Sequence, residues 1–371
     1  MKPYLKFAAI VVGSVALVAV GGTYGASYYY TSQYGQGCAS CHEMAAYVSV
    51  VHAAPHRTEG CMECHDASLA TKLRHMRIHI FGAIPENIRM RDVDVQEMTA
   101  SCRACHQQEY ASWHAGPHSA TYSQIFADPV QNSRQVLMDD CLRCHGMHFN
   151  GSIHDLVQPL NTKGPWRVIR SDLADQPAMP CMTCHQIHRE GAQETKPASR
   201  ISVTGAAVPP SLAFYDRRET LHFAATALSI PQLYDGARMV TVSQDPRQAL
   251  CYQCHAPRMP GAGSIAAAHA WGPQVGSGDD RTPMGVHEGL SCISCHDGHS
   301  GNTRASCKTC HPQMSHCGIG VEKMDTTYAS AASAHNIHWV KCTDCHQHGI
   351  PKAKAHSAVK AKLPTTPGMN G

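Results

Sequence analysis

A long apolar run lies near the N-terminus of the chain. Lys2 and Lys6 flank its start, and the positions from Phe7 to Tyr30 contain no charged residue. This run exceeds the roughly 20 apolar residues that a helix needs to cross the hydrocarbon core of a bilayer. The tyrosines at its end are typical of a membrane interface, and the lysines favour a cytoplasmic N-terminus. We therefore expect a cytoplasmic segment (1–6) and a transmembrane anchor (7–30), with a cleaved secretory signal as the alternative.

Further along the chain, the apolar positions predict short helices joined by loops. Apolar residues recur at helical intervals between Leu212 and Tyr234, which predicts a helix there. Basic residues cluster within residues 66–98, which could form a helix along lipid headgroups or a solvated amphipathic helix. The 29 glycines and 22 prolines imply much irregular chain. The sequence thus predicts a mainly α, loop-rich fold with one N-terminal transmembrane helix and little β structure.

A Cys-x-x-Cys-His motif recurs nine times. Two thiols at this spacing reach the two vinyl groups of one porphyrin, and the following imidazole lies under its iron. One copy could be a redox dithiol or half of a zinc site, but nine copies predict nine covalently bound c-type haems. We number the motifs along the chain: motif 1 is Cys38, Cys41 and His42; motif 2 is Cys61, Cys64 and His65; motif 3 is Cys102, Cys105 and His106; motif 4 is Cys141, Cys144 and His145; motif 5 is Cys181, Cys184 and His185; motif 6 is Cys251, Cys254 and His255; motif 7 is Cys292, Cys295 and His296; motif 8 is Cys307, Cys310 and His311; motif 9 is Cys342, Cys345 and His346.

The composition agrees with a core built from cofactor. Of 19 cysteines, the nine motifs use all but Cys317, so we expect no disulfide framework. Aromatic residues make up only 6% of the chain, and porphyrins would supply the missing apolar area at roughly 25 cal/mol per Å² buried. The formal charge of +3 becomes acidic once haem propionates are counted. No basic patch indicates a nucleic-acid partner.

The histidine count predicts a second axial ligand for most haems. Nine of the 27 histidines belong to motifs, and low-spin electron-transfer haems take a further His or Met ligand. About half of the spare histidines would remain surface or hydrogen-bonding residues. We favour His118 over His114, and we expect His148 and His188 to serve a neighbouring motif rather than their own. The distal candidates are His52, His56, His118, His148, His188, His287, His299 and His338.

The spacing of the motifs suggests two haem-binding domains. Motifs 1 to 5 lie within residues 31–190 and motifs 6 to 9 within residues 246–350. Residues 191–245 contain no cysteine and are interpreted as a linker with a haem-free helical segment. Residues 351–371 are rich in Lys, Ala, Pro and Gly, which favours a disordered basic tail.

The first part of the chain resembles a known family. The N-terminal apolar run, the methionine two places beyond motif 1, the H-x-x-x-H spacing of His52 and His56, and the nearby motif 2 resemble the NapC/NirT family of quinol dehydrogenases, including its NrfH type. The resemblance covers about residues 1–110, and the remainder resembles multihaem cytochromes c in general. It implies quinol oxidation at the first haem, with Met44 as an axial ligand beside His42 or in its place. The implied quinol-site candidates are Met44, Asp66, Lys72 and His75.

Two functional classes follow from these features. The first is an electron conduit from membrane quinol through the haems to a periplasmic or extracellular acceptor. It would sit in a bacterial inner membrane with its haem domains in the periplasm, and would dock with a partner cytochrome or reductase or join a larger membrane complex. The alternative is a reductase or oxidase of a small nitrogen or sulfur compound at one catalytic haem, with Cys317 as a candidate ligand. All nine motifs end in His, so the lysine-ligated variant of nitrite reductases is absent, which favours the conduit.

Overall fold

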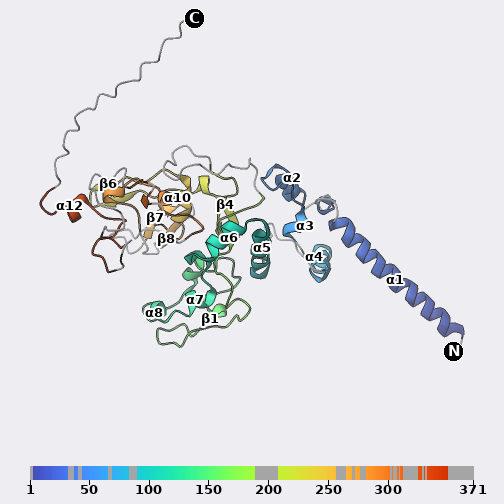
Figure 1. Cartoon of the computed structure of the whole chain (residues 1–371). Helices are drawn as coiled ribbons and strands as arrows, with labels where there is room; N and C mark the ends of the chain where they lie inside the picture. Colours follow the sequence, from blue (N-terminus) through green and yellow to red (C-terminus); the bar gives the residue numbers. More distant parts are fainter. Residues whose placement is uncertain are drawn as a thin grey trace, which may run out of the picture.

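A computed structural model of the chain describes most of the residues that the sequence singles out (Figure 1). Some residues on which the sequence predictions depend lie outside the described part of the chain. They are Cys41, His42, Asp66, Cys317 and the tail 351–371. Lys72 and His75 are described only by their backbone. The described ranges are 3–31, 37–40, 44–65, 69–82, 90–188, 208–255, 265–269, 272–275, 281–300, 303, 307–308, 310–311, 325–327, 330 and 332–349.

The N-terminal apolar run forms one helix, α1 (Pro3–Thr31). It projects away from the other labelled elements in Figure 1. Within it, the span Lys6–Tyr29 is long and apolar enough to cross a membrane, and none of it is buried against the protein. The expected helix of transmembrane length is therefore confirmed, and a signal sequence would have the same character.

Short helices gather at the C-terminal end of α1 (Figure 1). One of them, α5, buries Val95, and its first turn carries Asp92 and Asp94, favourable charges at a helix N-terminus. Asp94 accepts a hydrogen bond from the Arg91 backbone (3.3 Å), and Met98 packs with Met182. The elements of this region are η1 (Cys38–Ser40), α2 (Ala45–Ala53), α3 (Cys61–Cys64), α4 (Leu69–Phe81), α5 (Asp92–Cys105) and α6 (Gln107–His114).

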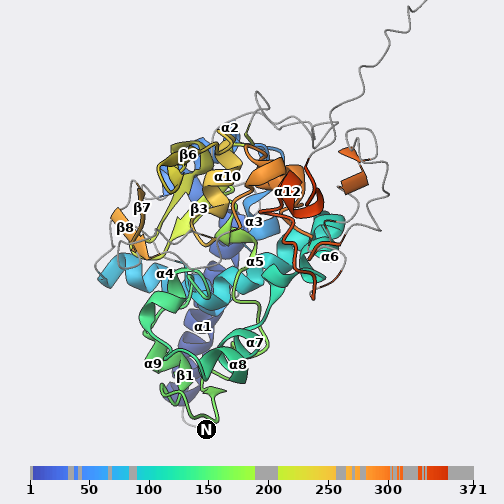
Figure 2. The same ribbon diagram turned by 90° about the vertical axis from the view of Figure 1, so that its left-hand side faces the viewer.

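Residues 117–183 form a lobe with its own apolar core. Tyr122, Phe126 and Phe149 are almost completely buried there. Thr121 caps α7 by accepting from the Gln124 backbone at 3.2 Å. Figure 2 shows α7, α8, α9 and β1 together at one end of the molecule. The elements are η3 (Pro117–Ser119), α7 (Tyr122–Phe126), α8 (Pro129–Asn132), η4 (Asp139–Arg143), α9 (Ile153–Leu156), β1 (Val157–Gln158), β2 (Arg167–Val168) and η5 (Cys181–Thr183).

The helix expected between Leu212 and Tyr234 is wrong, because this segment forms strands. Tyr215 pairs with His222 in an antiparallel hairpin. The turn between them is closed by Asp216, which accepts from the Arg218 backbone at 2.8 Å, and Thr220 adopts a φ of +56°. Such local side-chain bonds compete with helix formation. The elements are β3 (Ala213–Asp216), β4 (Leu221–Ala224), η6 (Ala225–Ala227), β5 (Leu233–Asp235) and β6 (Arg238–Val240).

The remaining described elements are short and surround the later motifs. They are α10 (Pro246–Cys251), β7 (Ile265–His269), β8 (Gly272–Val275), η7 (Gly285–His287), η8 (Cys292–Ser294) and α12 (Cys342–Cys345). Across the described residues the strands form only two-stranded antiparallel sheets. The fold is therefore mainly α and loop-rich with little β structure, as the sequence predicts.

The side-chain core is divided into separate clusters, and each borders a motif. Cys141 packs against the cluster around Tyr122, Cys254 against the cluster around Phe214, and Cys102 against the cluster around Met98. Motif cysteines also end helices, as Cys105 does in α5 and Cys251 in α10. The fold thus places motifs 3, 4 and 6 beside its apolar clusters.

Candidate functional site

The imidazole of His299 lies next to the imidazole of His185, the motif 5 histidine. Their ring centroids lie 6.0 Å apart and their planes differ by 5°. His185 follows η5, where its backbone pairs with Leu212 next to β3. His299 is held by Asp297, whose carboxylate accepts from the His299 backbone at 2.9 Å. A motif histidine and a histidine from a distant segment therefore form one pair.

Five more motif histidines have a second imidazole at the same distance. In each pair one ring belongs to a motif and the other to one of the distal candidates. The centroid separations are 5.9 Å for His65 with His188, 6.0 Å for His106 with His56, 6.3 Å for His255 with His118, 6.1 Å for His296 with His338, and 6.5 Å for His311 with His287.

This spacing fits a metal ion between the two rings. An imidazole nitrogen binds a first-row metal from about 2 Å, so two imidazoles on opposite sides of one ion have centroids about 6 Å apart. Rings in direct stacking contact come closer, as His148 and Tyr215 do at 4.2 Å. Within the described residues, no group of three or more His, Cys, Asp and Glu side chains could hold a metal by itself. The pairs suit an ion whose other ligands come from a porphyrin.

Hydrogen bonds orient two of the distal rings in the way a metal ligand requires. The Nδ1 of His118, in η3, donates to the Gly298 carbonyl oxygen at 3.4 Å. The Nδ1 of His287, in η7, donates to the Ile337 carbonyl oxygen at 3.1 Å. A ring that donates through Nδ1 keeps the lone pair on Nε2 for a metal. Both rings are therefore prepared to coordinate iron.

Two of the paired histidines favour the neutral form, which a metal ligand must have. Burial, together with the His299 imidazole and two further histidines nearby, lowers the pKa of His185 to about 4. Burial and the His65 imidazole lower the pKa of His188 to about 4 as well. The Nδ1 atoms of His56 and His311 are buried without a hydrogen-bond partner in the described structure. A bound group would account for such polar atoms in a native core.

Two distal candidates have other surroundings in the described part of the chain. His148 is buried and stacks on Tyr215, with ring planes 16° apart. His52 is exposed on α2, and His56 lies beyond the end of that helix, so the two do not share a helical face.

The sequence left two roles open for His222, an iron ligand or a residue of a helix. In the structure His222 lies on β4 and donates through Nε2 to the Met182 carbonyl oxygen at 2.7 Å.

The motif thiols also contact one another between motifs. A side-chain hydrogen bond joins Cys102 of motif 3 and Cys181 of motif 5. Two more join Cys254 of motif 6 to Cys144 of motif 4, and Cys292 of motif 7 to Cys251 of motif 6. Pairs at longer range are Cys64 with Cys105, Cys184 with Cys251, and Cys295 with Cys307 and Cys310. No disulfide joins the described cysteines, which leave out Cys41 and Cys317. The attachment sites thus lie next to one another.

Three of the quinol-site candidates lie on or next to α2 and α4, two helices near the C-terminal end of α1 (Figure 1). Met44 immediately precedes α2, and Lys72 and His75 are on α4. Figure 1 shows α2, α3 and α4 beside the C-terminal end of α1. Their placement near one another remains a prediction, because the side chains of Lys72 and His75 and the whole of Asp66 are outside the description.

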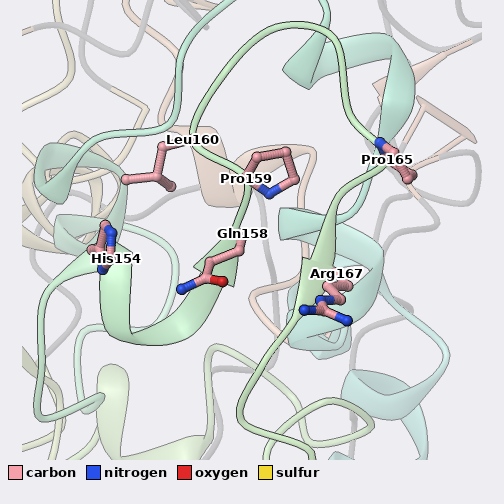
Figure 3. A pocket seen from close by; sticks show the side chains of 6 residues that line it. All are labelled: His154, Gln158, Pro159, Leu160, Pro165 and Arg167. Atoms are coloured by element: carbon pink, nitrogen blue, oxygen red, sulfur yellow. The ribbon is translucent and has the colours of Figure 1, made fainter.

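An open pocket in the lobe is distinct from the motif residues. It has a volume of about 600 Å³ and lies between α9 and the β1–β2 hairpin (Figure 3). Its lining residues are His154, Gln158, Pro159, Leu160, Pro165 and Arg167. None of them belongs to a motif or to an imidazole pair, so this pocket is not part of the candidate haem site.

Comparison with known proteins agrees with the nature of the site. Residues 101–160 match the family model described as cytochrome c554 and c-prime. The matched segment contains motifs 3 and 4 and the distal candidate His118. No curated protein and no solved structure matches the chain. The match supports a multihaem c-type cytochrome with covalently bound haem, and it does not single out the NapC/NirT family.

Proposed function

We propose that this chain is a nine-haem electron conduit that accepts electrons from membrane quinol and delivers them to a periplasmic or extracellular acceptor. The family match supports haem-based electron transfer in general. The observation that carries the proposal further is the set of six motif imidazoles that each face a second imidazole at 5.9–6.5 Å. We assign the second imidazoles, His56, His118, His188, His287, His299 and His338, as distal ligands.

The pairing favours electron transfer over catalysis at these six sites. Two imidazoles occupy both axial positions of an iron and leave no coordination site for a substrate. The protein contributes positioning and electrostatics, while the haem supplies the redox chemistry. The contacts between thiols of different motifs add a route, because each thiol marks the edge of one porphyrin. Adjacent edges favour electron transfer from motif to motif.

The membrane end of the proposed route is the region around α1 and α4. On α4, Ile78, Ile80 and Phe81 expose 41%, 61% and 83% of their surface. Basic residues, including Arg77, are interspersed among these apolar side chains. A helix with exposed apolar and basic side chains next to a membrane anchor suits the boundary between headgroups and acyl chains. This arrangement supports the interpretation that α4 lies along the membrane beside motif 1.

Motif 1 is the proposed entry point for electrons. Cys38 lies seven positions beyond Thr31, the last residue of α1, so the anchor would hold this motif at the lipid surface. Met44 would give its iron a thioether ligand, which raises the potential relative to two imidazoles. Asp66, Lys72 or His75 would take up the protons that quinol oxidation releases. The partners in this proposal are the quinone pool and a redox protein at the far end.

Reduction by quinol tests this proposal. Met44→Ala and a truncation that removes residues 1–30 should each abolish reduction by a menaquinol analogue while leaving reduction by dithionite intact. Met138→Ala is a matched control, because Met138 is an exposed methionine in the distant lobe. Wild-type rates of reduction by quinol in both test variants would refute the quinol link. A periplasmic electron carrier would then be the better account of the function. A high-spin haem that reacts with nitrite or hydroxylamine would instead favour the enzyme alternative.

A further inference from the structure

Two short loops of the same construction carry distal ligands. In the first loop, the Asp297 carbonyl oxygen accepts from the Ser300 backbone at 3.2 Å, and the Asp297 side chain accepts from the His299 backbone at 2.9 Å. Aspartate and asparagine favour the first position of such a loop, because their side chains can accept from the backbone two residues later. The loop thereby fixes the backbone of His299, which we assign to the iron of motif 5.

The second loop repeats both hydrogen bonds. The Asn336 carbonyl oxygen accepts from the Trp339 backbone at 2.9 Å, and the Asn336 side chain accepts from the His338 backbone at 3.0 Å. His338 is the ligand that we assign to the iron of motif 7. Both loops thus begin with the sequence Asx-x-His, where Asx is aspartate or asparagine and the histidine supplies the imidazole.

In each loop the imidazole also lies beside the Asx side chain that fixes its backbone. The Nδ1 of His338 donates to the Asn336 Oδ1 at 3.0 Å, which leaves the lone pair of Nε2 for a metal. The Nδ1 of His299 lies 3.7 Å from the Asp297 Oδ1. This separation is longer than a hydrogen bond, but it puts a carboxylate charge beside the ring. The two loops therefore present an amide to one ligand and a carboxylate to the other.

The middle residue of each Asx-x-His sequence contacts a ligand of a second iron. The Gly298 carbonyl oxygen accepts from His118 at 3.4 Å, and we assign His118 to motif 6. The Ile337 carbonyl oxygen accepts from His287 at 3.1 Å, and we assign His287 to motif 8. Each loop thus holds one imidazole beside its own Asx side chain and a second imidazole at its peptide carbonyl.

We propose that Asp297 and Asn336 are positioning residues for the irons of motifs 5 and 7, and that the Asp297 carboxylate lowers the midpoint potential of the motif 5 haem. The proposal rests on the proposed function in that His299 and His338 are distal ligands. A carboxylate beside a metal-bound imidazole makes the ring a more basic ligand. A nearby negative charge also favours ferric iron over ferrous iron, which carries one positive charge less. The neutral Asn336 amide supplies no such charge.

Exchanging the two Asx residues tests the effect of the charge. Asp297→Asn and Asn336→Asp each keep a side-chain oxygen that can accept from the histidine backbone, so both loops should remain intact. We would titrate the full-length, detergent-solubilised holoprotein with a chemical reductant and follow the haem signals by electron paramagnetic resonance. Asp297→Asn should shift the motif 5 midpoint to a higher potential, and Asn336→Asp should shift the motif 7 midpoint to a lower potential.

The ligand variants identify the two signals. The motif 5 signal is the low-spin signal that His299→Ala converts to high spin, and the motif 7 signal is the one that His338→Ala converts. An unmoved midpoint in either exchange variant, or a shift in the opposite direction, would overturn the role of the charge. Low-spin signals that stay unchanged in both alanine variants would instead overturn the ligand assignment on which the proposal rests.

Removing the acceptor oxygen tests the positioning role separately. Asn336→Ala takes away the oxygen that binds both the backbone and the Nδ1 of His338, so the imidazole is free to rotate. The g values of the motif 7 signal should then change, whereas Asn336→Asp, which keeps an acceptor oxygen, should preserve them more closely. Unchanged g values in Asn336→Ala would show that Asn336 does not position this ligand.

Asp128→Asn is the matched control for the charge. The Asp128 side chain accepts from the Val130 backbone two residues later at 2.7 Å, but α8, which it caps, contains no histidine. Asparagine is an equally good residue at a helix start, so this variant loses only a carboxylate. It should shift no midpoint, and a shift equal to that of Asp297→Asn would trace the effect to net charge and overturn the proposal. Because the titration uses no quinol, its result is independent of the quinol link.

Discussion

The imidazoles of His185 and His299 lie next to each other, with centroids 6.0 Å apart, although motifs 6 and 7 separate the two residues in the sequence. The reciprocal relationship joins His118, before motif 4, to His255 of motif 6. Under the proposed assignment, each half of the chain supplies a ligand to a haem attached to the other half. The two predicted haem domains would then depend on each other for complete iron coordination.

Removing one of these crossing ligands should affect one haem. His299→Ala takes away the imidazole opposite His185, so we expect one low-spin signal to convert to a high-spin signal in electron paramagnetic resonance. His114→Ala is the matched control, because His114 is exposed on α6 and stacks on Tyr110 rather than on a motif histidine. An unchanged low-spin spectrum in His299→Ala would remove His299 from the ligand set.

A glycine near the last motifs should resist substitution. Gly285 has a φ of +67°, and a Cβ there would lie 2.2 Å from the Val340 carbonyl oxygen. The Val286 backbone donates to that same oxygen at 3.0 Å, which links η7 to the segment that bears His338. We expect Gly285→Ala to lower the free energy of unfolding by roughly 1–3 kcal/mol from backbone strain, with further loss from the clash.

The control for this glycine isolates the clash from the backbone strain. Gly236 has a similar φ of +63°, but a Cβ there would meet nothing within 4 Å. Thermal unfolding followed by Soret absorbance should show a clearly larger loss for Gly285→Ala than for Gly236→Ala. Equal losses would mean that the contact between η7 and Val340 does not constrain the fold.

Acid should weaken the β3–β4 hairpin through Asp216. Burial alone would raise the pKa of this carboxyl, but hydrogen bonds and charge from Arg218, 2.7 Å away, hold the pKa below its usual value. A carboxyl with a lowered folded-state pKa stabilises the fold above its unfolded pKa of about 3.9, and this contribution is lost as the pH falls through the folded value.

Asp216→Asn tests this pH dependence. At neutral pH the variant should be about 1–2 kcal/mol less stable, because it loses a hydrogen bond to a charged partner. The difference from the wild type should shrink as the pH falls below about 4. Denaturant unfolding at a series of pH values measures it, and a difference that grows toward low pH would show that the sign is wrong.

The mass of the purified protein tests haem loading and the anchor together. The polypeptide has a mass of 40.2 kDa, and we expect the observed mass to exceed it by nine haems. A loss of about 2 kDa would indicate a cleaved signal instead of a retained helix. A smaller haem increment would mean that at least one motif is not loaded.

Local spacing made part of the site predictable. The thiols and imidazole of each motif are neighbours in sequence, so their joint role follows from one short pattern. The preference for His118 over His114 agrees with the placement of its ring opposite His255. The α1 helix could also be predicted, because its apolar run is continuous.

Long-range relationships could not be predicted in the same way. The sequence contains no local signal that His299 faces motif 5 or that His56 faces motif 3, because these pairings depend on how distant segments pack. His148 shows the converse: its place three residues after a motif resembles that of His188, yet it stacks on Tyr215 of β3. Apolar periodicity failed for residues 212–234 because turn bonds at Asp216 compete with a helix.

A density map of the haem-loaded protein tests the central claim most directly. The account predicts an iron between the rings of each pair, with the haem bonded to the cysteines of the motif that supplies one of them. For the haem of motif 5, the map should show His185 and His299 on opposite faces of the iron. An iron of motif 5 with any other residue, or with none, opposite His185 would contradict the account.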